Sequence, residues 1–590
     1  MKKIVPGLVL VAIVFAVYAP ALRNGFVWDD TALIQRDPLI RSWRLIPEGF
    51  QHFLFTDATV SNFYRPIQRL TYTLDYGAFA FRPLGYHLTN ILCHLGAAFA
   101  LFLFGNELLG LFGVEERQSR RIAFLATLAW AIHPVHTAAV VYVSGRADPL
   151  AAAFGFLGLY SAMRALRTSK RNRWILLLVA GALFLLSGLS KEMGIIFLLF
   201  WCAILLLKKE WRELRPATVV VLFVSVIYLS LRQPAEHVPP PRFHPPAPLL
   251  VRPILAARAL AEYAGLILLP INLHMERDVE TRAEGESEVR ADNAARSTGQ
   301  TLLGILLAAG AVYWLTRSRR QDLALFCTLV LAALAYLPVS GIFPLNATIA
   351  EHWIYLPTAF LFLAASLTIS RFSISSRVVG PALAVWLLFL GTRTWIRTFD
   401  WRDQRTFLER TIASGGDSAR MLINLAGLEL NEGQLDSAKS HLALALRKEP
   451  NQPLAILNLA SVAIRQDDFA TAHNLLNRAI EVPFIEGKAY ELLAVLDHRE
   501  TGRIELTRFQ LAARMGPSDW SIERRYVQAL DQSGATAAAI AELKSCLVSQ
   551  WYRAESWQLL SELLIKEGHA AEGAEARARA EAYDVHLDGR

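Results

Sequence analysis

Long apolar stretches recur from the N-terminus to residue 394, and they constrain the fold more than any other feature of the chain. About 20 apolar residues are enough for a helix to cross a bilayer. Hydrophobic residues make up 54% of the 590 residues, which is more than a soluble protein of this size usually carries. We therefore predict an all-α fold with a polytopic membrane domain over residues 1–394 and about eleven transmembrane helices. The predicted spans are 4–22, 87–109, 121–140, 147–166, 174–190, 194–207, 216–231, 300–316, 321–338, 355–370 and 378–394.

The loops between these stretches differ in charge. Lys2 and Lys3 precede the first stretch, and short basic loops follow at every second gap. Because Lys and Arg concentrate in cytoplasmic loops, we predict that the N-terminus lies inside the cell. A first outer loop (23–86), a second long outer loop (232–299) and the chain after residue 394 then lie outside. The basic loops are 117–121, 164–173, 208–215, 317–320 and 371–377.

Three segments need separate treatment. The first apolar stretch resembles a signal peptide with a cleavage site at residues 19–21, but its length favours a retained helix. Segment 251–271 is apolar but carries three charged residues that are costly in lipid, so we predict a helix at the interface or packed within the protein. The proline-rich segment 237–248 is expected to be extended.

Charge and cysteine content exclude several classes of protein. The net charge of +8 arises largely from the short basic loops, so membrane orientation explains it and no nucleic-acid partner is predicted. The four cysteines have neither disulfide-framework nor metal-site spacing. No metal or other cofactor is predicted.

The motif FVWDD places two adjacent carboxylates, Asp29 and Asp30, at the start of the first outer loop. Ionisable residues at the rims of spans usually mark function. The charge rule sorts further polar residues of this kind to the same outer face, whereas a random scatter would divide them between both faces. They are Tyr64, Arg65, Asp75, His87, His94, His133, His136, Arg146, Asp148, Lys191, Glu192, Glu351 and His352.

Each of these groups also has a structural explanation. One Asp of the pair could cap a surface helix while its neighbour reacts. His133 and His136 could cap or pack the end of a span. Arg146 and Asp148 could form an ion pair that closes a turn. The Lys-Glu pair at 191–192 could simply end two helices, and Asp75 and His94 are expected to be packing residues.

The chain after residue 417 shows a period of 34 residues. Ala426, Gly433, Ala438, Ala445 and Pro450 in one unit correspond to Ala460, Asp467, Ala472, Ala479 and Pro483 in the next. This is the tetratricopeptide pattern, in which small residues let two antiparallel helices approach closely. We predict a linker that docks the repeats to the membrane surface (395–417) and a solenoid of about five repeats (418–590), whose groove binds a protein.

An ordered set of motifs resembles one enzyme family along nearly the whole chain. The set is FVWDD, FYRPIQRLTYTLDY, GYHLTNILCH, HPVHTAAVVYVSGRAD, LSKEMG and EHWIYLPT, followed by the repeats. It looks like the transmembrane and tetratricopeptide repeat-containing O-mannosyltransferases, in a bacterial member. That family belongs to the GT-C glycosyltransferases, which are all-helical membrane enzymes. The resemblance therefore implies a multi-pass protein of the bacterial inner membrane. Its active site and repeats are expected on the extracytoplasmic side.

The resemblance also implies a mechanism and roles. A carboxylate deprotonates a Ser or Thr hydroxyl of an extracytoplasmic protein, which attacks a sugar carried by a polyprenyl phosphate, with inversion. Asp29 matches the first acidic position of the family and is expected to be the base, with Asp30 positioning the acceptor or raising the pKa of the base. The expected donor-phosphate ligands are Arg65, Arg146 and Lys191. The expected sugar or acceptor pocket is Tyr64, His133, His136, Asp148, Glu192, Glu351 and His352. The family implies metal independence.

Two positions depart from the family. Ala138 stands where members often have Glu, and His352 stands where many have Arg. Because these positions could contact the sugar or the phosphate, the identity of the sugar as mannose follows only from the resemblance to the family. Two alternatives stay open. One is a GT-C enzyme that uses a glycan or lipid acceptor or transfers an oligosaccharide en bloc. The other is a non-enzymatic envelope scaffold that recruits partners through the repeats.

Overall fold

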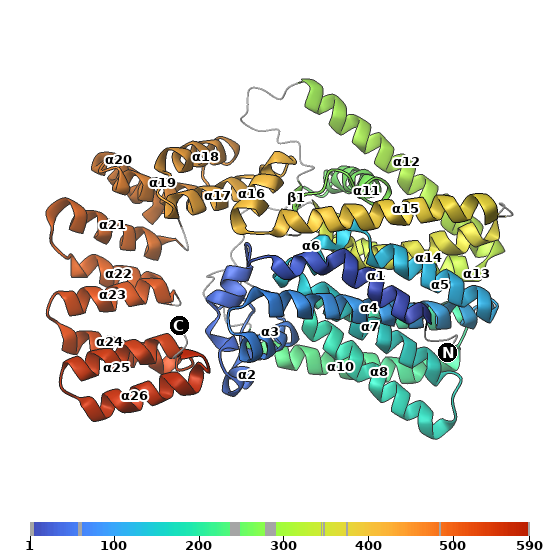
Figure 1. The fold of residues 1–590 in the computed structure, drawn as a ribbon, viewed down its shortest axis with the longest axis horizontal. Coiled ribbons are helices and arrows are strands. Elements are labelled where there is room, and N and C mark those ends of the chain that lie inside the picture. The colour runs from blue at the N-terminus through green and yellow to red at the C-terminus, as the bar shows by residue number, and fades with distance from the viewer. Residues whose placement is uncertain are drawn as a thin grey trace.

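The computed structural model describes residues 5–56, 62–235, 248–277, 291–343, 345, 349–372, 376–482, 485–517 and 519–587. The protein consists of a bundle of long helices, on the right in Figure 1, and a curved row of shorter helices on the left. The described residues contain one two-stranded antiparallel sheet, formed by β1 (Glu276–Arg277) and β2 (Ile349–Ala350). The proline-rich segment lies outside the described residues except for Pro248.

A helix occupies each of the eleven predicted spans of the bundle. Of the described helices, five are long and apolar enough to cross a membrane, or six if α5 and α6, which bend by 57°, form one span. The number of spans therefore stays a prediction. The helices are α1 (Val5–Tyr18), α4 (Pro83–Leu111), α5 (Glu116–Ala131), α6 (Thr137–Val140), α7 (Ala147–Ala165), α8 (Lys170–Ser190), α9 (Ile196–Lys208), α10 (Leu214–Arg232), α12 (Ala291–Gln321), α13 (Leu323–Tyr336), α14 (Tyr355–Arg371) and α15 (Ser376–Arg397).

Segment 251–271 forms helix α11 (Arg252–Leu268), which packs against α12. A side chain at Gly304 of α12 would meet the backbone oxygen of Ala257 at 1.8 Å, so glycine permits this close approach. Glu262 of α11 forms an ion pair with Arg277. Arg258 of the same helix donates to the hydroxyl of Thr301 on α12. Both charged side chains thus have partners within the protein, which fits the packed setting of the two that were predicted.

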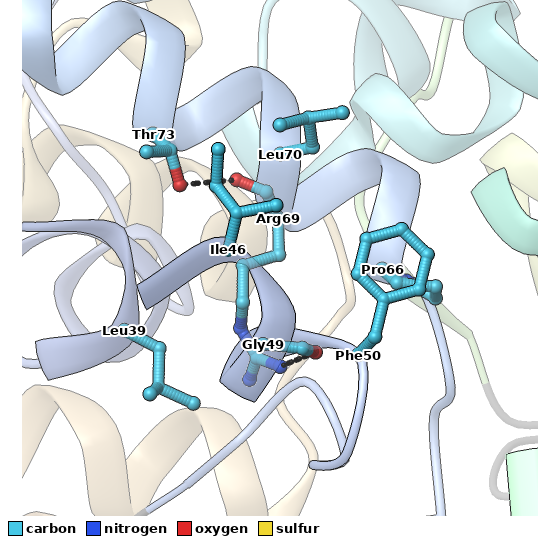
Figure 2. Close-up of a pocket in the computed structure, with 8 residues that line it drawn as sticks. All are labelled: Leu39, Ile46, Gly49, Phe50, Pro66, Arg69, Leu70 and Thr73. Atoms are coloured by element: carbon cyan, nitrogen blue, oxygen red, sulfur yellow. Dashed lines mark hydrogen bonds between the residues drawn. The ribbon is translucent and has the colours of Figure 1, made fainter. Parts of the chain in front are cut away.

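The first outer loop is built around Arg69, on helix α3 (Pro66–Phe79). Its guanidinium group pairs with Asp37 at 3.0 Å and donates to four backbone oxygens between Gly49 and Leu54. Figure 2 shows this side chain beside the short helix α2 (Ile46–Gly49), with its bond to Gly49 dashed. A buried arginine with this many partners fixes a loop that has little regular structure of its own.

The row of shorter helices consists of five antiparallel pairs, in agreement with the predicted repeats. Gly433, Gly534 and Gly568 adopt positive φ at the turns within pairs, and Asp467 takes the same conformation in the second pair. The pairs are α17 (Ala419–Asn431) with α18 (Leu435–Lys448), α19 (Pro453–Arg465) with α20 (Phe469–Ile480), α21 (Glu486–Thr501) with α22 (Leu506–Met515), α23 (Trp520–Gln532) with α24 (Thr536–Ser549), and α25 (Ala554–Lys566) with α26 (Ala570–Tyr583).

The linker before the solenoid and the C-terminal end of the solenoid both contact the first outer loop. In the linker, the backbone oxygen of Arg402, just before helix α16 (Gln404–Ala413), accepts from the backbone N–H of Gly25. Aromatic residues of this linker belong to the same hydrophobic core as the bundle. At the C-terminal end, Tyr76 donates to buried Asp584 at 2.7 Å, and Ser42 donates to the backbone oxygen of Ala582. Loop and solenoid therefore lie together at one end of the bundle (Figure 1).

Candidate active site on the first outer loop

The two adjacent carboxylates have different surroundings. The Asp30 side chain is fully buried; one oxygen accepts hydrogen bonds from the backbone N–H and hydroxyl of Ser144, and the other accepts from the backbone N–H of Val27. Asp29 is only half-buried. Its backbone N–H donates to the hydroxyl of Tyr142 at 3.2 Å. Asp30 therefore links loop and bundle, whereas Asp29 retains some exposure.

Burial sets the proton affinity of both carboxyl groups. Burial raises the pKa of Asp30 to about 7, although the hydrogen bonds from Ser144 and Val27 lower this pKa. Burial also raises the pKa of Asp29, while Tyr142, Arg420 and Arg65 act in the opposite direction. An aspartate with a raised pKa is a stronger base than a solvated one, and it still holds a negative charge near neutral pH when cations lie nearby.

Two ion pairs interact by charge, and one of them contains Arg65, whose charge also acts on Asp29. Arg65 Nε lies 3.0 Å from a carboxylate oxygen of Glu192, whose other oxygen accepts from the backbone N–H of Tyr64 at 2.9 Å. Lys191 Nζ lies 2.6 Å from Asp148 Oδ1. These side chains come from α7, from the start of α3 and from the turn after α8, and each retains some exposure. The turn LSKEMG thus places Lys191 and Glu192 against the first outer loop.

Electrostatic contacts join these residues into one cluster. The charge of Arg65 acts on Asp29, on the Lys191–Asp148 pair and on His352. The pKa of Lys191 is lowered, mainly by burial, although Asp148 opposes this shift. We name Asp29, Arg65, Asp148, Lys191, Glu192 and His352 the outer-loop cluster. Its two cations, Arg65 and Lys191, could bind an anionic substrate. The carboxylate of Asp29 could accept a proton from a neutral substrate.

The geometry corrects the expectation that Arg146 binds the donor phosphate. Its side chain is fully buried and forms a 2.6 Å ion pair with Asp75. The same guanidinium donates to Asn90, to the hydroxyl of Thr71 and to the backbone oxygen of Tyr86. The ion pair of Arg146 is therefore structural, but its partner is Asp75 and not Asp148. Asp75, expected to be a packing residue, supplies the charge that Arg146 needs.

Four residues expected in the sugar or acceptor pocket are also enclosed. One is Tyr64, which is fully buried and whose hydroxyl donates to the backbone oxygen of Phe50. His133 accepts from the backbone N–H of Val135 and contacts the backbone oxygen of Ile267, which matches the capping explanation. His136 is buried against aromatic rings, and Glu351 is buried 3.5 Å from a guanidinium nitrogen of Arg397. Full burial with internal partners leaves these four residues no surface for a sugar.

Sequence reasoning missed residues that organise the site. Tyr142 and Ser144 lie in the motif YVSGR, next to the residue that was singled out, Arg146. Arg69 lies one helical turn after Arg65, on α3. Neutral hydroxyl groups and a buried arginine carry no pattern that separates them from packing residues, so no sequence signal would have identified their roles. Among the described residues, no group of three His, Cys, Asp or Glu side chains could hold a metal ion.

Known proteins resemble this chain in sequence. Protein O-mannosyl-transferase F38B6.6 of Caenorhabditis elegans is 24% identical over 454 residues, which are 75% of this chain and 63% of that protein. Protein O-mannosyl-transferase TMTC3 of Homo sapiens is 24% identical over 529 residues, which are 83% of this chain and 56% of that protein. The chain is a relative of the protein O-mannosyl-transferases. The resemblance drawn from its motifs is confirmed, and the chain spans less than two thirds of the length of these relatives.

The repeats are also matched independently. A family model described as tetratricopeptide repeat matches residues 407–483, which confirms the repeats predicted in the first part of the solenoid. The crystal structure of ArnT from Cupriavidus metallidurans bound to undecaprenyl phosphate is 15% identical, covers 84% of this chain and 77% of its own, and has a TM-score of 0.39. A bacterial origin stays a prediction.

Proposed function

We propose that this chain is an inverting GT-C glycosyltransferase that moves a sugar from a polyprenyl-phosphate carrier to Ser or Thr hydroxyl groups of proteins outside the cytoplasm. The observation that carries the proposal is the difference between the two carboxylates. Asp30 has its oxygens occupied by internal donors, while half-buried Asp29 stands within reach of the charge of Arg65. The names of the relatives support mannose as the sugar.

Asp29 is the general base in this proposal. Its carboxylate takes the proton of the acceptor hydroxyl while that oxygen attacks the anomeric carbon of the sugar, and the bond from that carbon to the carrier phosphate breaks. Because the attack comes from the side opposite the phosphate, the configuration inverts. Burial raises the pKa of Asp29, which increases its strength as a base. The hydrogen bond from Tyr142 and the charges of Arg420 and Arg65 oppose that shift and favour the ionised carboxylate.

Arg65 and Lys191 stabilise the leaving phosphate in this proposal. Arg65 pairs with Glu192 through Nε, which leaves the terminal amino groups of the guanidinium for two phosphate oxygens. The Lys191 ammonium group, which pairs with Asp148, interacts with the negative charge that develops on the phosphate, and its interaction with Asp148 weakens at that point. His352, which is only partly buried, then borders the sugar, at the position where the family often has arginine.

The repeats recruit the acceptor protein in this proposal. A tetratricopeptide solenoid presents an extended surface for polypeptide binding. Here the linker before the solenoid and the C-terminal end of the solenoid contact the loop that carries Asp29, so a bound acceptor lies near the base. The apolar helices and the basic loops between them support a multi-pass membrane protein with this site on the extracytoplasmic side.

The test uses the purified full chain in lipid vesicles with a polyprenyl-phosphate mannose donor and a Ser/Thr-rich acceptor protein. Asp29→Asn should lower the transfer rate by about 100-fold or more, because general-base catalysis contributes on that order. Asp436→Asn changes the same side-chain type at an exposed position on α18 and should leave the rate unchanged. Full activity of Asp29→Asn would remove Asp29 as the base.

The same assay separates the alternatives. Transfer to a lipid or glycan acceptor, with none to protein, would support the second enzyme class. Failure of the unmodified protein to transfer sugar to any of the three acceptors, while the repeats still capture protein, would support the scaffold.

A further inference from the structure

The ring of Tyr142 contacts two tryptophans from distant parts of the chain. Trp28 of the first outer loop stacks on it at a centroid distance of 6.1 Å, and Trp401 of the linker stacks on it at 5.4 Å. Phe407 of α16 contacts both tryptophan rings, at 5.7 and 4.8 Å. These four rings form an aromatic stack that joins the outer loop, the bundle and the linker to the solenoid.

The backbone at Asp29 depends on the same contacts. Trp28, the preceding residue, adopts a positive φ of 51°, which is unfavourable for a bulky side chain and persists only when its surroundings enforce it. Its backbone N–H donates to Oε1 of Gln404 in α16 at 2.5 Å. The backbone N–H of Asp29 donates to the Tyr142 hydroxyl. The linker therefore holds Trp28 directly and holds Asp29 through Tyr142.

The Tyr142 hydroxyl also touches the reactive group. It interacts with the carboxyl of Asp29 and with the hydroxyl of Ser144, which in turn donates to Asp30 at 2.6 Å. The other charged groups that act on Asp29 are Asp30, Arg65 and Arg420, the last from α17 of the solenoid. Tyr142 is thus the neutral member of a set that otherwise acts on Asp29 by charge.

We propose, on the basis of the function above, that Tyr142 is a positioning residue through which docking of the solenoid fixes the conformation of Asp29. The linker rings of Trp401 and Phe407 fix the rings of Tyr142 and Trp28. The Tyr142 hydroxyl then fixes the backbone and the carboxylate of Asp29. If the repeats served only to capture acceptor proteins, the solenoid would not need a connection to Asp29. Because the connection exists, docking of the solenoid should position Asp29 for every acceptor, including short peptides that do not bind the solenoid.

Tyr142→Phe is the deciding variant, because it keeps the ring in the stack and removes only the hydroxyl. With a short Ser-containing peptide as acceptor, kcat should fall by about 10-fold or more, the size of a lost hydrogen bond to a charged group. KM for the lipid donor should stay the same. The hydroxyl lowers the pKa of Asp29, so its removal should move the acid limb of the pH–rate profile to higher pH. A role in packing alone would leave that limb in place.

Trp401 tests the connection to the linker. Trp401→Ala should reproduce the loss of kcat, and Trp401→Phe, which retains an aromatic ring, should restore most of it. Trp395→Ala changes a half-exposed tryptophan on α15 and should keep full activity. The proposal is overturned if Tyr142→Phe shows the kcat and the acid limb of the unmodified protein. If Asp29→Asn itself remains active, the proposed function fails, and the two failures are therefore distinguishable.

Discussion

Ser144 donates two hydrogen bonds to a single carboxylate oxygen of Asp30, from its backbone N–H at 2.8 Å and from its hydroxyl at 2.6 Å. Asp30 lies at the start of the first outer loop, and Ser144 lies in the short helix Val143–Arg146 before α7. This contact anchors the loop to the bundle directly beside the candidate base. The neighbour of the base is therefore a structural group whose protonation affects stability.

The stability of the folded protein should decrease as pH rises through the titration of Asp30. Burial raises the pKa of Asp30 from 3.8 to about 7, so the folded state binds its proton more tightly than the unfolded state. The stabilisation from that proton is fully present below about pH 4 and is lost as pH rises through about 7. Thermal unfolding in detergent should show a decrease in Tm over this range, and Asp30→Asn should make it shallower.

Asp436→Asn serves as the control, because Asp436 is an exposed carboxylate on α18. It should leave the pH dependence of Tm as it is in the unmodified protein. An equally steep dependence in Asp30→Asn would assign the effect to other groups.

Arg146 and Asp75 should behave as a coupled structural pair. Removing either charge leaves the other buried without its partner, which costs about 3 to 5 kcal/mol of unfolding free energy. Arg146→Gln and Asp75→Asn should each lower the Tm and the yield of folded protein, and the double variant should recover part of the loss. If both single variants are as stable as the unmodified protein, the ion pair is not structural, and Arg146 returns as a candidate phosphate ligand.

The fold could be predicted from the sequence because its determinants are local. Each apolar stretch by itself predicts a helix buried in lipid or in the core. The 34-residue period predicts that paired helices approach closely, as they do at Ala426 and Ala438. The setting of α11 was predictable because Glu262 and Arg258 are too costly to leave in lipid. The docking of the C-terminal end was not predictable, since contacts such as Tyr76 with Asp584 join residues about 500 positions apart.

The candidate site could be predicted only in part. The charge rule brought Asp29, Arg65, Lys191 and His352 to one face, and the structure brings the same residues together. The sequence could not tell which charged residues have internal partners. Asp75 lies 71 positions before Arg146, and only the packing of α3 against α4 and the turn before α7 makes them a pair.

The topology has a direct test, because the linker and the first outer loop contact each other. Gly25 donates to Arg402, so both segments lie on one side of the membrane. A reporter enzyme fused after Gly415 that is active only outside the cytoplasm should therefore be active, and a fusion in the basic loop 317–320 should be inactive. The opposite pattern would place Asp29 in the cytoplasm and exclude extracytoplasmic acceptors.

Loss of the Lys191 charge should weaken donor binding more than it weakens acceptor binding. A charge-assisted hydrogen bond to a phosphate is worth about 1.5 to 3 kcal/mol, so Lys191→Met should raise the KM for the lipid donor by about 10- to 100-fold. The steady-state KM for both substrates measures this. Arg120→Gln removes a cation from an exposed pair on α5 and should leave both constants unchanged. A change confined to the acceptor KM would assign Lys191 to the acceptor and not to the phosphate.

The contact between the C-terminal end and the outer loop should stabilise the last repeat more than it stabilises the bundle. Tyr76→Phe removes one hydrogen bond to Asp584, a residue that is 1% exposed and that also accepts from the backbone N–H of His586. A hydrogen bond to a charged group contributes about 1.5 to 3 kcal/mol, enough to increase local opening at α26 by about 10- to 150-fold when it is lost. Hydrogen exchange should therefore accelerate in residues 570–587 and stay unchanged in α4 and α7.

Tyr313→Phe, on an exposed face of α12, is the matched control. Uniform acceleration across both regions would instead show that the end of the solenoid opens only when the whole protein unfolds.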